Sequence, residues 1–278
     1  MSSAAGLRLS WLDVFTDRPL AGNPLGVVPD ADGLSAERMQ AIAAELRLSE
    51  TVFVFGGAER LRIFTPRAEL PLAGHPVIGT TVELARLGRI PADGDHVFQT
   101  GVGDTAVAMA DGVASMRQGA FDPGVELDPM EVAPLLGLAE ADVTSAPRAG
   151  STVGWPQAFV RVRDRETLRE LQPDLAAILA FERADGVLAW CENGDGSLAQ
   201  RFFSPRMGIA EDPATGSAAG GLGALRVFEG SAPAGETVTV FQGEEIGRPS
   251  EILVTVAALD DIRVAGRAVL VMEGELRL

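Results

Sequence analysis

The stretch RIFTPRAELPLAGHPVIGT, residues 62–80, decides the fold because part of it returns in the second half of the chain. RIFTPR at 62–67 recurs as RFFSPR at 201–206, a displacement of half the 278-residue length. Each copy leads through a short loop into a small-residue motif, LAGHPVIGT or EDPATGSAAG. A six-residue match can arise by chance, but the shared spacing and downstream context favour an internal duplication.

The segments around the repeat predict the same local structure in both halves. Residues 51–55 and 61–65 are typical of a strand, turn and strand, as are 185–192 and 198–203. A helix is predicted over 35–47 with Ser35 as its N-cap, and a counterpart over 164–180 is interrupted by Pro173. Further helices are predicted after each motif, near 76–87 and 217–228.

Strands outnumber helices among the remaining segments, so the predicted class is α+β. The turn-rich stretch QGAFDPGVELDP, residues 118–129, favours a division into domains 1–120 and 121–278. The last strand of the chain could belong to the first domain rather than to the second.

Composition narrows the possible functions. The start lacks the pattern of a signal peptide and no run approaches 18 apolar residues, so we expect a cytoplasmic protein without membrane spans. The net charge of −16 argues against a nucleic-acid partner. All 23 cationic residues are arginine, which excludes a pyridoxal phosphate Schiff base and a Walker A lysine.

Two histidines and one cysteine argue against a zinc site, and no dense acidic loop suggests another metal. We therefore expect no metal. Cys191 lies in the apolar run GVLAWC and is interpreted as an inert core thiol. Acid–base chemistry would then depend on Glu, Asp, His75 or His96, and His96 is interpreted as structural.

Glu50 is the first candidate for such chemistry. A hairpin turn centred near residue 58 would bring Glu50 opposite residue 66, where the chain enters the LAGHP loop. Apolar neighbours, Leu48, Val52 and Phe53, would favour a raised pKa and general acid–base work. The alternative is a solvated glutamate at the end of a strand.

The two small-residue motifs are candidates for binding an anion. GHP and TGS each open a predicted helix, whose free N–H groups and dipole favour a carboxylate. If the halves are pseudo-symmetric, both helix starts could hold one substrate carboxylate. Simple capping is the alternative for Ser217, and a turn-and-cap role is the alternative for Glu211 and Asp212. Arg67 and Arg206 are interpreted equally well as carboxylate ligands or as solvated side chains.

Five segments together resemble the signature segments of the PhzF family, the phenazine-biosynthesis-like isomerases. They are DVFTDRPLAGNPLGVV, LSETVFVF, PLAGHPVIGTT, EDPATGSAAG and QGEEIGRPSEI, which span most of the chain. The resemblance implies two pseudo-symmetric halves of the diaminopimelate epimerase-like fold. Each half would be a mostly antiparallel sheet wrapped around a helix, with a cleft between them. It also implies a homodimer and cofactor-independent isomerisation of a small carboxylic acid.

The resemblance further implies roles for individual residues. Glu50 would remove and redeliver the proton, with His75 and Asp212 assisting catalysis. Substrate binding would involve Gly74, His75, Asp212, Gly216 and Ser217. Related epimerases use two cysteines, where this chain has His75 and Ser217, so inversion by a thiol pair is excluded.

The resemblance leaves the reaction itself open between three readings. The leading one is isomerisation of a dihydro-hydroxyanthranilate type of substrate. A second keeps the fold but moves a double bond in another natural-product precursor, such as an unsaturated proline-type acid. A third is a carboxylate-binding protein without catalysis, against which the complete Glu50, His75, Asp212 and Ser217 set argues.

Overall fold

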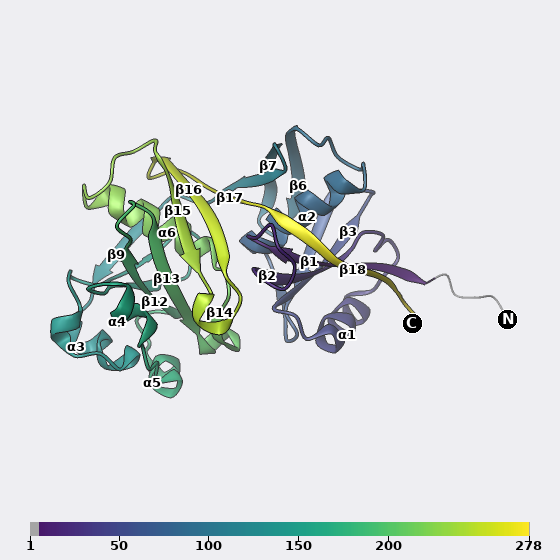
Figure 1. Ribbon diagram of the computed structural model, residues 1–278. Coiled ribbons are helices and arrows are strands. Elements are labelled where there is room, and N and C mark those ends of the chain that lie inside the picture. Colours follow the sequence, from purple (N-terminus) through teal and green to yellow (C-terminus); the bar gives the residue numbers. More distant parts are fainter. Residues whose placement is uncertain (1–5, 278) are drawn as a thin grey trace. The chain divides into compact units, whose positions relative to one another are not determined.

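The computed structural model describes residues 6–277, which form two compact units (Figure 1). Unit 1 holds the described residues up to Arg117 together with those from Ala265 onward, and unit 2 is Gln118–Val264. Both units are built mainly of β-strands, and the class is α+β as predicted. Among the described residues, no helix combines the length and the apolar character needed to cross a membrane.

Unit 1 is a mostly antiparallel sheet with a buried helix, α2. Its strands pair in the order β18–β1–β2–β3–β4–β6–β7–β8, and only β2–β3 and β4–β6 are parallel. The short β5 adds to β4. The strands are β1 (Leu7–Val14), β2 (Asn23–Val28), β3 (Glu50–Phe55), β4 (Arg60–Phe64), β5 (Glu69–Leu70), β6 (Gly94–Thr100), β7 (Gly103–Ala110), β8 (Val113–Arg117) and β18 (Ala268–Leu276).

The two helices of unit 1 lie in different surroundings. Helix α2 (Gly74–Arg86) contacts strands at both ends of this order, from β18 and β1 to β7 and β8. A helix with neighbours at both ends of the sheet must be enclosed by it, and most residues of α2 are buried accordingly. Helix α1 (Ala36–Leu46) packs Met39, Ile42 and Ala43 against β3 and β4.

Unit 2 has the same plan around helix α6 (Gly216–Phe228). Its strands pair in the order β9–β10–β11–β12–β13–β15–β16, with β14 added to β13, and only β11–β12 and β13–β15 are parallel. The strands are β9 (Asp122–Glu126), β10 (Arg148–Ser151), β11 (Gln157–Arg161), β12 (Gly186–Glu192), β13 (Leu198–Ser204), β14 (Ile209–Asp212), β15 (Thr237–Gln242) and β16 (Ser250–Ala258). The strand β17 (Asp261–Gly266) continues from unit 2 into unit 1.

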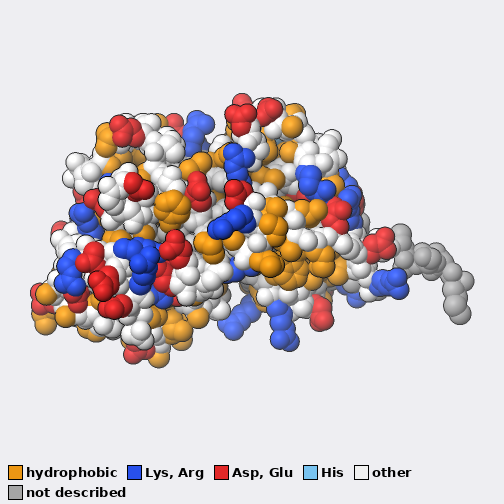
Figure 2. Space-filling view, in the orientation of Figure 1, with side chains coloured by type: hydrophobic (Ala, Val, Ile, Leu, Met, Phe, Trp, Pro, Cys, Tyr) orange, Lys and Arg blue, Asp and Glu red, His pale blue; other side chains and the backbone are white. Residues whose placement is uncertain are grey.

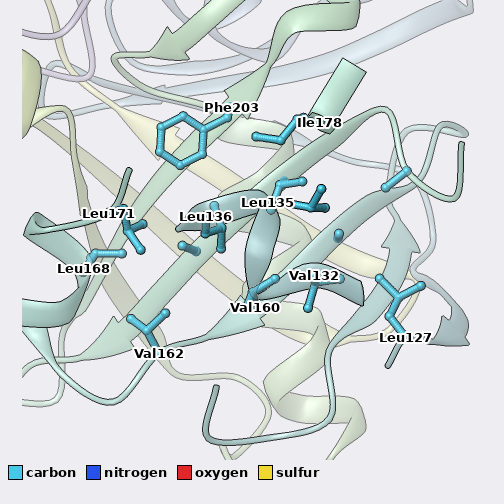
Figure 3. Close-up of a cluster of buried hydrophobic side chains, with 14 of the residues drawn as sticks. Leu127, Val132, Leu135, Leu136, Val160, Val162, Leu168, Leu171, Ile178 and Phe203 are labelled. Carbon is cyan, nitrogen blue, oxygen red and sulfur yellow. The ribbon is translucent and has the colours of Figure 1, made fainter. Parts of the chain in front are cut away.

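A second layer in unit 2 contains the short helices α3 (Pro129–Val132), α4 (Arg165–Arg169) and α5 (Leu175–Ala180). Their apolar side chains pack on residues of β11, β12 and β13, and Figure 3 shows Val132, Leu168 and Ile178 in this cluster with Val160 and Phe203. This layer leaves α6 to cover the other side of the strands. Helix α6 is lined with glycine because it lies close to them: a Cβ at Gly221 would meet the Phe159 ring at 2.7 Å.

Both units therefore repeat one sequence of strand pairings, antiparallel, parallel, antiparallel, parallel and antiparallel. It runs from β1 to β7 in unit 1 and from β10 to β16 in unit 2. RIFTPR and RFFSPR begin on β4 and β13, which hold corresponding places in this sequence of pairings. Descent of the two halves from one ancestral unit stays a prediction.

Most predicted helices are confirmed. Ser35 is the N-cap of α1, where its hydroxyl accepts a hydrogen bond from the Arg38 N–H at 3.3 Å. The predicted interruption at Pro173 separates α4 from α5. Both motif-borne helices are present, as α2 and α6.

The predicted hairpin register is wrong by one residue. Thr51 lies opposite Phe64 and Phe55 opposite Arg60, so extending the ladder places Glu50 opposite residue 65 rather than 66. The reason is a four-residue turn, which centres the hairpin between residues 57 and 58, with Gly56 and Gly57 at positive φ. On the other side of β3, Glu50 lies beside Leu25 of the parallel strand β2, a neighbour that was not predicted from the sequence.

Charged side chains are spread over the face of the molecule that Figure 2 shows. On that face, arginines and acidic residues are interspersed and no extended basic patch is visible.

Candidate active site

Glu50 and His75 lie together in unit 1. Glu50 is the first residue of β3, and His75 is the second residue of α2. Their side chains are both about 8% exposed, and Oε2 of Glu50 lies 3.4 Å from Nε2 of His75. The alternative of a solvated strand-end glutamate is therefore wrong, because the sheet and α2 enclose the carboxyl group.

His75 is a neutral imidazole at physiological pH. Burial lowers its pKa to about 3, and a hydrogen bond to the backbone carbonyl of Pro24 only partly opposes that shift. The contact with Glu50 is therefore close enough for an ion pair but is not one, since the ring carries no charge. A neutral ring does not hold Glu50 in its ionised form as a cation would.

The start of β2 and the residue before β3 support this pair. The Ser49 hydroxyl lies 3.1 Å from Oδ1 of Asn23 and 3.3 Å from the carbonyl oxygen of Pro24, to which His75 also bonds. Asn23 is almost fully buried. These residues were not predicted, although Asn23 and Pro24 lie in the segment DVFTDRPLAGNPLGVV that carries part of the family resemblance.

The start of α2 supplies backbone donors next to His75. Its N-cap is Ala73, which has no side-chain group to cap the helix. The N–H groups of Gly74 and His75 lie in the first turn and have no acceptor inside the helix, and Pro76 has no N–H at all. This is the arrangement that favours a bound anion.

Asp212 and Thr215 lie together in unit 2. Asp212 ends β14 and is 6% exposed, and its Oδ2 accepts a hydrogen bond of 2.5 Å from the Thr215 hydroxyl. Thr215 is the N-cap of α6, yet its side chain makes no capping bond to the helix. The hydroxyl that would ordinarily cap α6 is thus used to hold Asp212.

The first turn of α6 is fixed by three polar side chains from the surrounding strands and loops. Gln118 donates to the carbonyl oxygen of Gly216 at 2.9 Å, and the Thr152 hydroxyl donates to the backbone carbonyl oxygen of Ser217 at 3.3 Å. Gln157, which is fully buried, donates to the Ser217 hydroxyl at 3.2 Å. None of these three was predicted, because each comes from a distant part of the sequence.

Other candidates from the sequence have structural partners. Glu211 forms a bidentate pair with Arg201, with both N···O distances 2.8 Å. Arg206 lies 3.3 Å from Asp185 and also donates to carbonyl groups of the α5 region. His96 binds the carbonyl oxygen of Ala58 at 2.9 Å.

Two further positions complete the comparison with the sequence. Cys191 is buried in β12, as predicted for a core thiol. Arg67 is exposed in the loop between β4 and β5. Within residues 6–277, no group of three or more His, Cys, Asp and Glu side chains is placed to hold a metal ion.

Comparison with known proteins identifies similar chains. The profile of the PhzC-PhzF family, described as phenazine biosynthesis-like protein, matches residues 12–274. The trans-2,3-dihydro-3-hydroxyanthranilate isomerase of Pseudomonas aeruginosa is 37% identical over 252 residues, which cover 87% of each chain. An uncharacterized isomerase of Pasteurella multocida is 34% identical over 95% of this chain and 92% of its own.

Solved structures show the same fold. A phenazine biosynthesis protein of the PhzF family from Bacillus anthracis matches with a TM-score of 0.86 and 30% identity, over 98% of this chain and 99% of its own. A hydroxyproline epimerase from Agrobacterium vitis matches with a TM-score of 0.65 at 12% identity, over 99% of this chain and 94% of its own. The second match concerns the fold alone, and the predicted epimerase-like fold is confirmed.

Proposed function

The chain belongs to the phenazine biosynthesis-like (PhzC-PhzF) family, and on that premise we propose a cofactor-independent isomerase that moves a proton on a small cyclic carboxylic acid. The proposed substrate is of the trans-2,3-dihydro-3-hydroxyanthranilate type, after the name of the Pseudomonas aeruginosa relative. The observation that supports the proposal best is the buried Glu50 carboxyl group, 3.4 Å from a neutral His75.

Glu50 is the proposed proton-transfer group. As a carboxylate it takes a proton from one carbon of the substrate, and as a carboxylic acid it returns that proton to another. His75 favours this exchange by staying neutral: a cationic ring at 3.4 Å would stabilise the carboxylate and weaken it as a base. The nearby imidazole nitrogen is also within reach of the proton while Glu50 carries it.

The helix starts are proposed to bind and orient the substrate. First-turn N–H groups of Gly74 and His75 in α2, and of Gly216 and Ser217 in α6, would receive carboxylate oxygens. Asp212 assists as a hydrogen-bond acceptor held by Thr215. Fixed donors of this kind cost no reorganisation during the reaction, which is why they contribute to rate as well as to binding.

The test is solvent exchange during turnover. The purified chain is incubated with trans-2,3-dihydro-3-hydroxyanthranilate in D₂O, and NMR follows product formation and deuterium incorporation. Glu50→Gln should lower both rates by at least about 10²-fold. Glu59→Gln, at an exposed position in the β3–β4 turn, should leave them unchanged. A Glu50→Gln variant with the parent's exchange rate would refute the assignment.

A homodimer is also proposed, and the family resemblance is its support. Light scattering of the purified chain measures the mass directly. A mass near twice the 29.1 kDa of one chain is expected, and a mass of one chain would contradict it.

A further inference from the structure

Behind Asp212, unit 2 contains an enclosed set of polar side chains, of which the proposed mechanism uses only Thr215. Gln242 ends β15 and is 1% exposed, and Gln200 in β13 is fully buried. The two strands run parallel here, with Gln200 in register with Gln242. Thr215, 8% exposed, lies between Gln242 and Asp212.

The direction of each hydrogen bond in this set is fixed by its chemistry. The backbone N–H of Thr215 can only donate, and it donates to Oε1 of Gln242 at 2.9 Å. The backbone carbonyl of Asp212 can only accept, and it accepts from Nε2 of Gln242 at 2.7 Å. The amide of Gln242 therefore has one orientation, with its NH₂ group toward Asp212 and Thr215.

That orientation decides the role of the Thr215 hydroxyl. Nε2 of Gln242 lies 3.1 Å from Oγ1 of Thr215 and has only hydrogens to offer, so the hydroxyl accepts this bond. Its own hydrogen is then directed to Oδ2 of Asp212, 2.5 Å away. Gln200 reinforces the arrangement by donating to Oε1 of Gln242 at 2.6 Å.

Local stability alone does not account for this arrangement. A threonine at an N-cap ordinarily accepts from an N–H of the first turn, a bond worth about 1 kcal/mol, and Thr215 does not make it. Oε1 of Gln200 is buried without a hydrogen-bond partner among the described residues, which is a further cost. The missing N-cap bond and the unpartnered Gln200 oxygen both belong to an arrangement that directs the Thr215 hydroxyl hydrogen to the Asp212 carboxylate.

We propose that Gln242 is a positioning residue, which acts through the Thr215 hydroxyl to hold Asp212 as an oriented hydrogen-bond acceptor at the start of α6. The role of Asp212 in catalysis rests on the proposed function, whereas the relay itself does not. Gln242 is the first residue of the segment QGEEIGRPSEI, which carries part of the family resemblance. A glutamine side chain has no acid–base chemistry of its own, and positioning Asp212 would be its role.

Three variants separate the relay from ordinary packing. Thr215→Val keeps the shape but removes the hydroxyl, whereas Thr215→Ser keeps the hydroxyl. Gln242→Glu accepts the Thr215 N–H but cannot donate, so the hydroxyl hydrogen turns from Asp212 to the new carboxylate. Thr239→Val, on the same strand β15, is the matched control.

The first measurement does not depend on any substrate. In protein labelled with ¹³C-aspartate, the Asp212 carboxyl signal is assigned with Asp212→Asn and read at pH 7. It should move in Thr215→Val and in Gln242→Glu, and stay in place in Thr215→Ser and Thr239→Val. A signal that does not move in Gln242→Glu would overturn the proposal, whether or not the chain turns over any substrate.

The second measurement uses trans-2,3-dihydro-3-hydroxyanthranilate. Thr215→Val and Gln242→Glu should each lower kcat/KM roughly ten- to hundred-fold, the effect of losing one bond to a charged group. The double variant should be no worse than the poorer single variant, because both remove one donor. Equal losses in Thr215→Ser and Thr215→Val, or losses that only follow the folded fraction, would contradict the relay. A moved Asp212 signal in a chain that shows no turnover would refute the proposed function and leave the relay standing.

Discussion

The buried neutral state of His75 makes a quantitative prediction about pH and stability. The unfolded imidazole has a pKa of 6.5, and burial lowers the folded value to about 3. Above pH 6.5 the ring is neutral in both states and adds no pH dependence. Below that pH the unfolded chain binds a proton that the folded chain does not, so the free energy of unfolding decreases as the pH is lowered. The loss approaches about 1.4 kcal/mol per unit and reaches about 2 kcal/mol at pH 5 relative to pH 7.5.

The perturbation that isolates this contribution is His75→Asn, which removes the titrating group. Urea unfolding followed by circular dichroism, from pH 5 to 7.5, gives the free energy of unfolding of parent and variant. Carboxylates contribute equally to both, so the difference between the two curves should change by about 2 kcal/mol over this range. His96→Asn is the control, because His96 lies on β6 and binds the Ala58 carbonyl. Parallel curves for parent and His75→Asn would refute the reasoning.

A direct measurement is available because the chain has only two histidines. Imidazole ¹⁵N resonances, assigned with the two variants, should show His75 neutral throughout the range from pH 5 to 7.5. A His75 ring that takes up a proton near pH 6.5 would contradict the burial argument and the neutral contact with Glu50.

Three other predictions concern the packing of the units. Gly221→Ala should destabilise unit 2 by about 1–3 kcal/mol, because the new Cβ would meet the Phe159 ring at 2.7 Å, whereas Gly194→Ala, with open space around it, should be close to neutral in urea unfolding. Ser35→Ala should cost about 1 kcal/mol through the loss of the α1 cap, and a melting temperature equal to the parent's would contradict that role. Cys191 should react with a thiol reagent at pH 8 only when the chain unfolds, because burial excludes the reagent and raises the pKa of the thiol, so rapid labelling of the native chain would contradict its placement.

The parts of the fold that could be predicted are those with local causes. Ser35 and the apolar spacing after it specify α1, and Pro173 divides α4 from α5 because it cannot continue a helix. The nearness of Glu50 to the GHP loop also followed from local structure, since a hairpin returns the chain to where it began. The predicted register was wrong by one residue because it depends on how many residues the turn contains. That number depends on the positive φ angles of Gly56 and Gly57, which the sequence pattern did not show.

What could not be predicted depends on contacts between distant segments. The neutral state of His75 follows from its enclosure by the sheet, which is a property of the assembled unit. Gln242 reaches Asp212 because β15 pairs with β13, 42 residues before it in register, and no local pattern encodes that parallel pairing. The contacts of Asn23 and Gln157 could not be predicted for the same reason. Family resemblance marked two of the segments concerned, but it did not say what their polar side chains bind.

The uncapped starts of α2 and α6 also have a consequence for how folding and ligand binding are coupled. Ala73 has no side-chain group to cap α2, and the Thr215 hydroxyl does not cap α6. The backbone N–H groups in the first turn of each helix therefore have no acceptor within the helix. A bound carboxylate would supply the missing acceptors and become the cap. If the proposed carboxylate binds there, the first turn of each helix would be completed by the ligand rather than by a side chain of the protein.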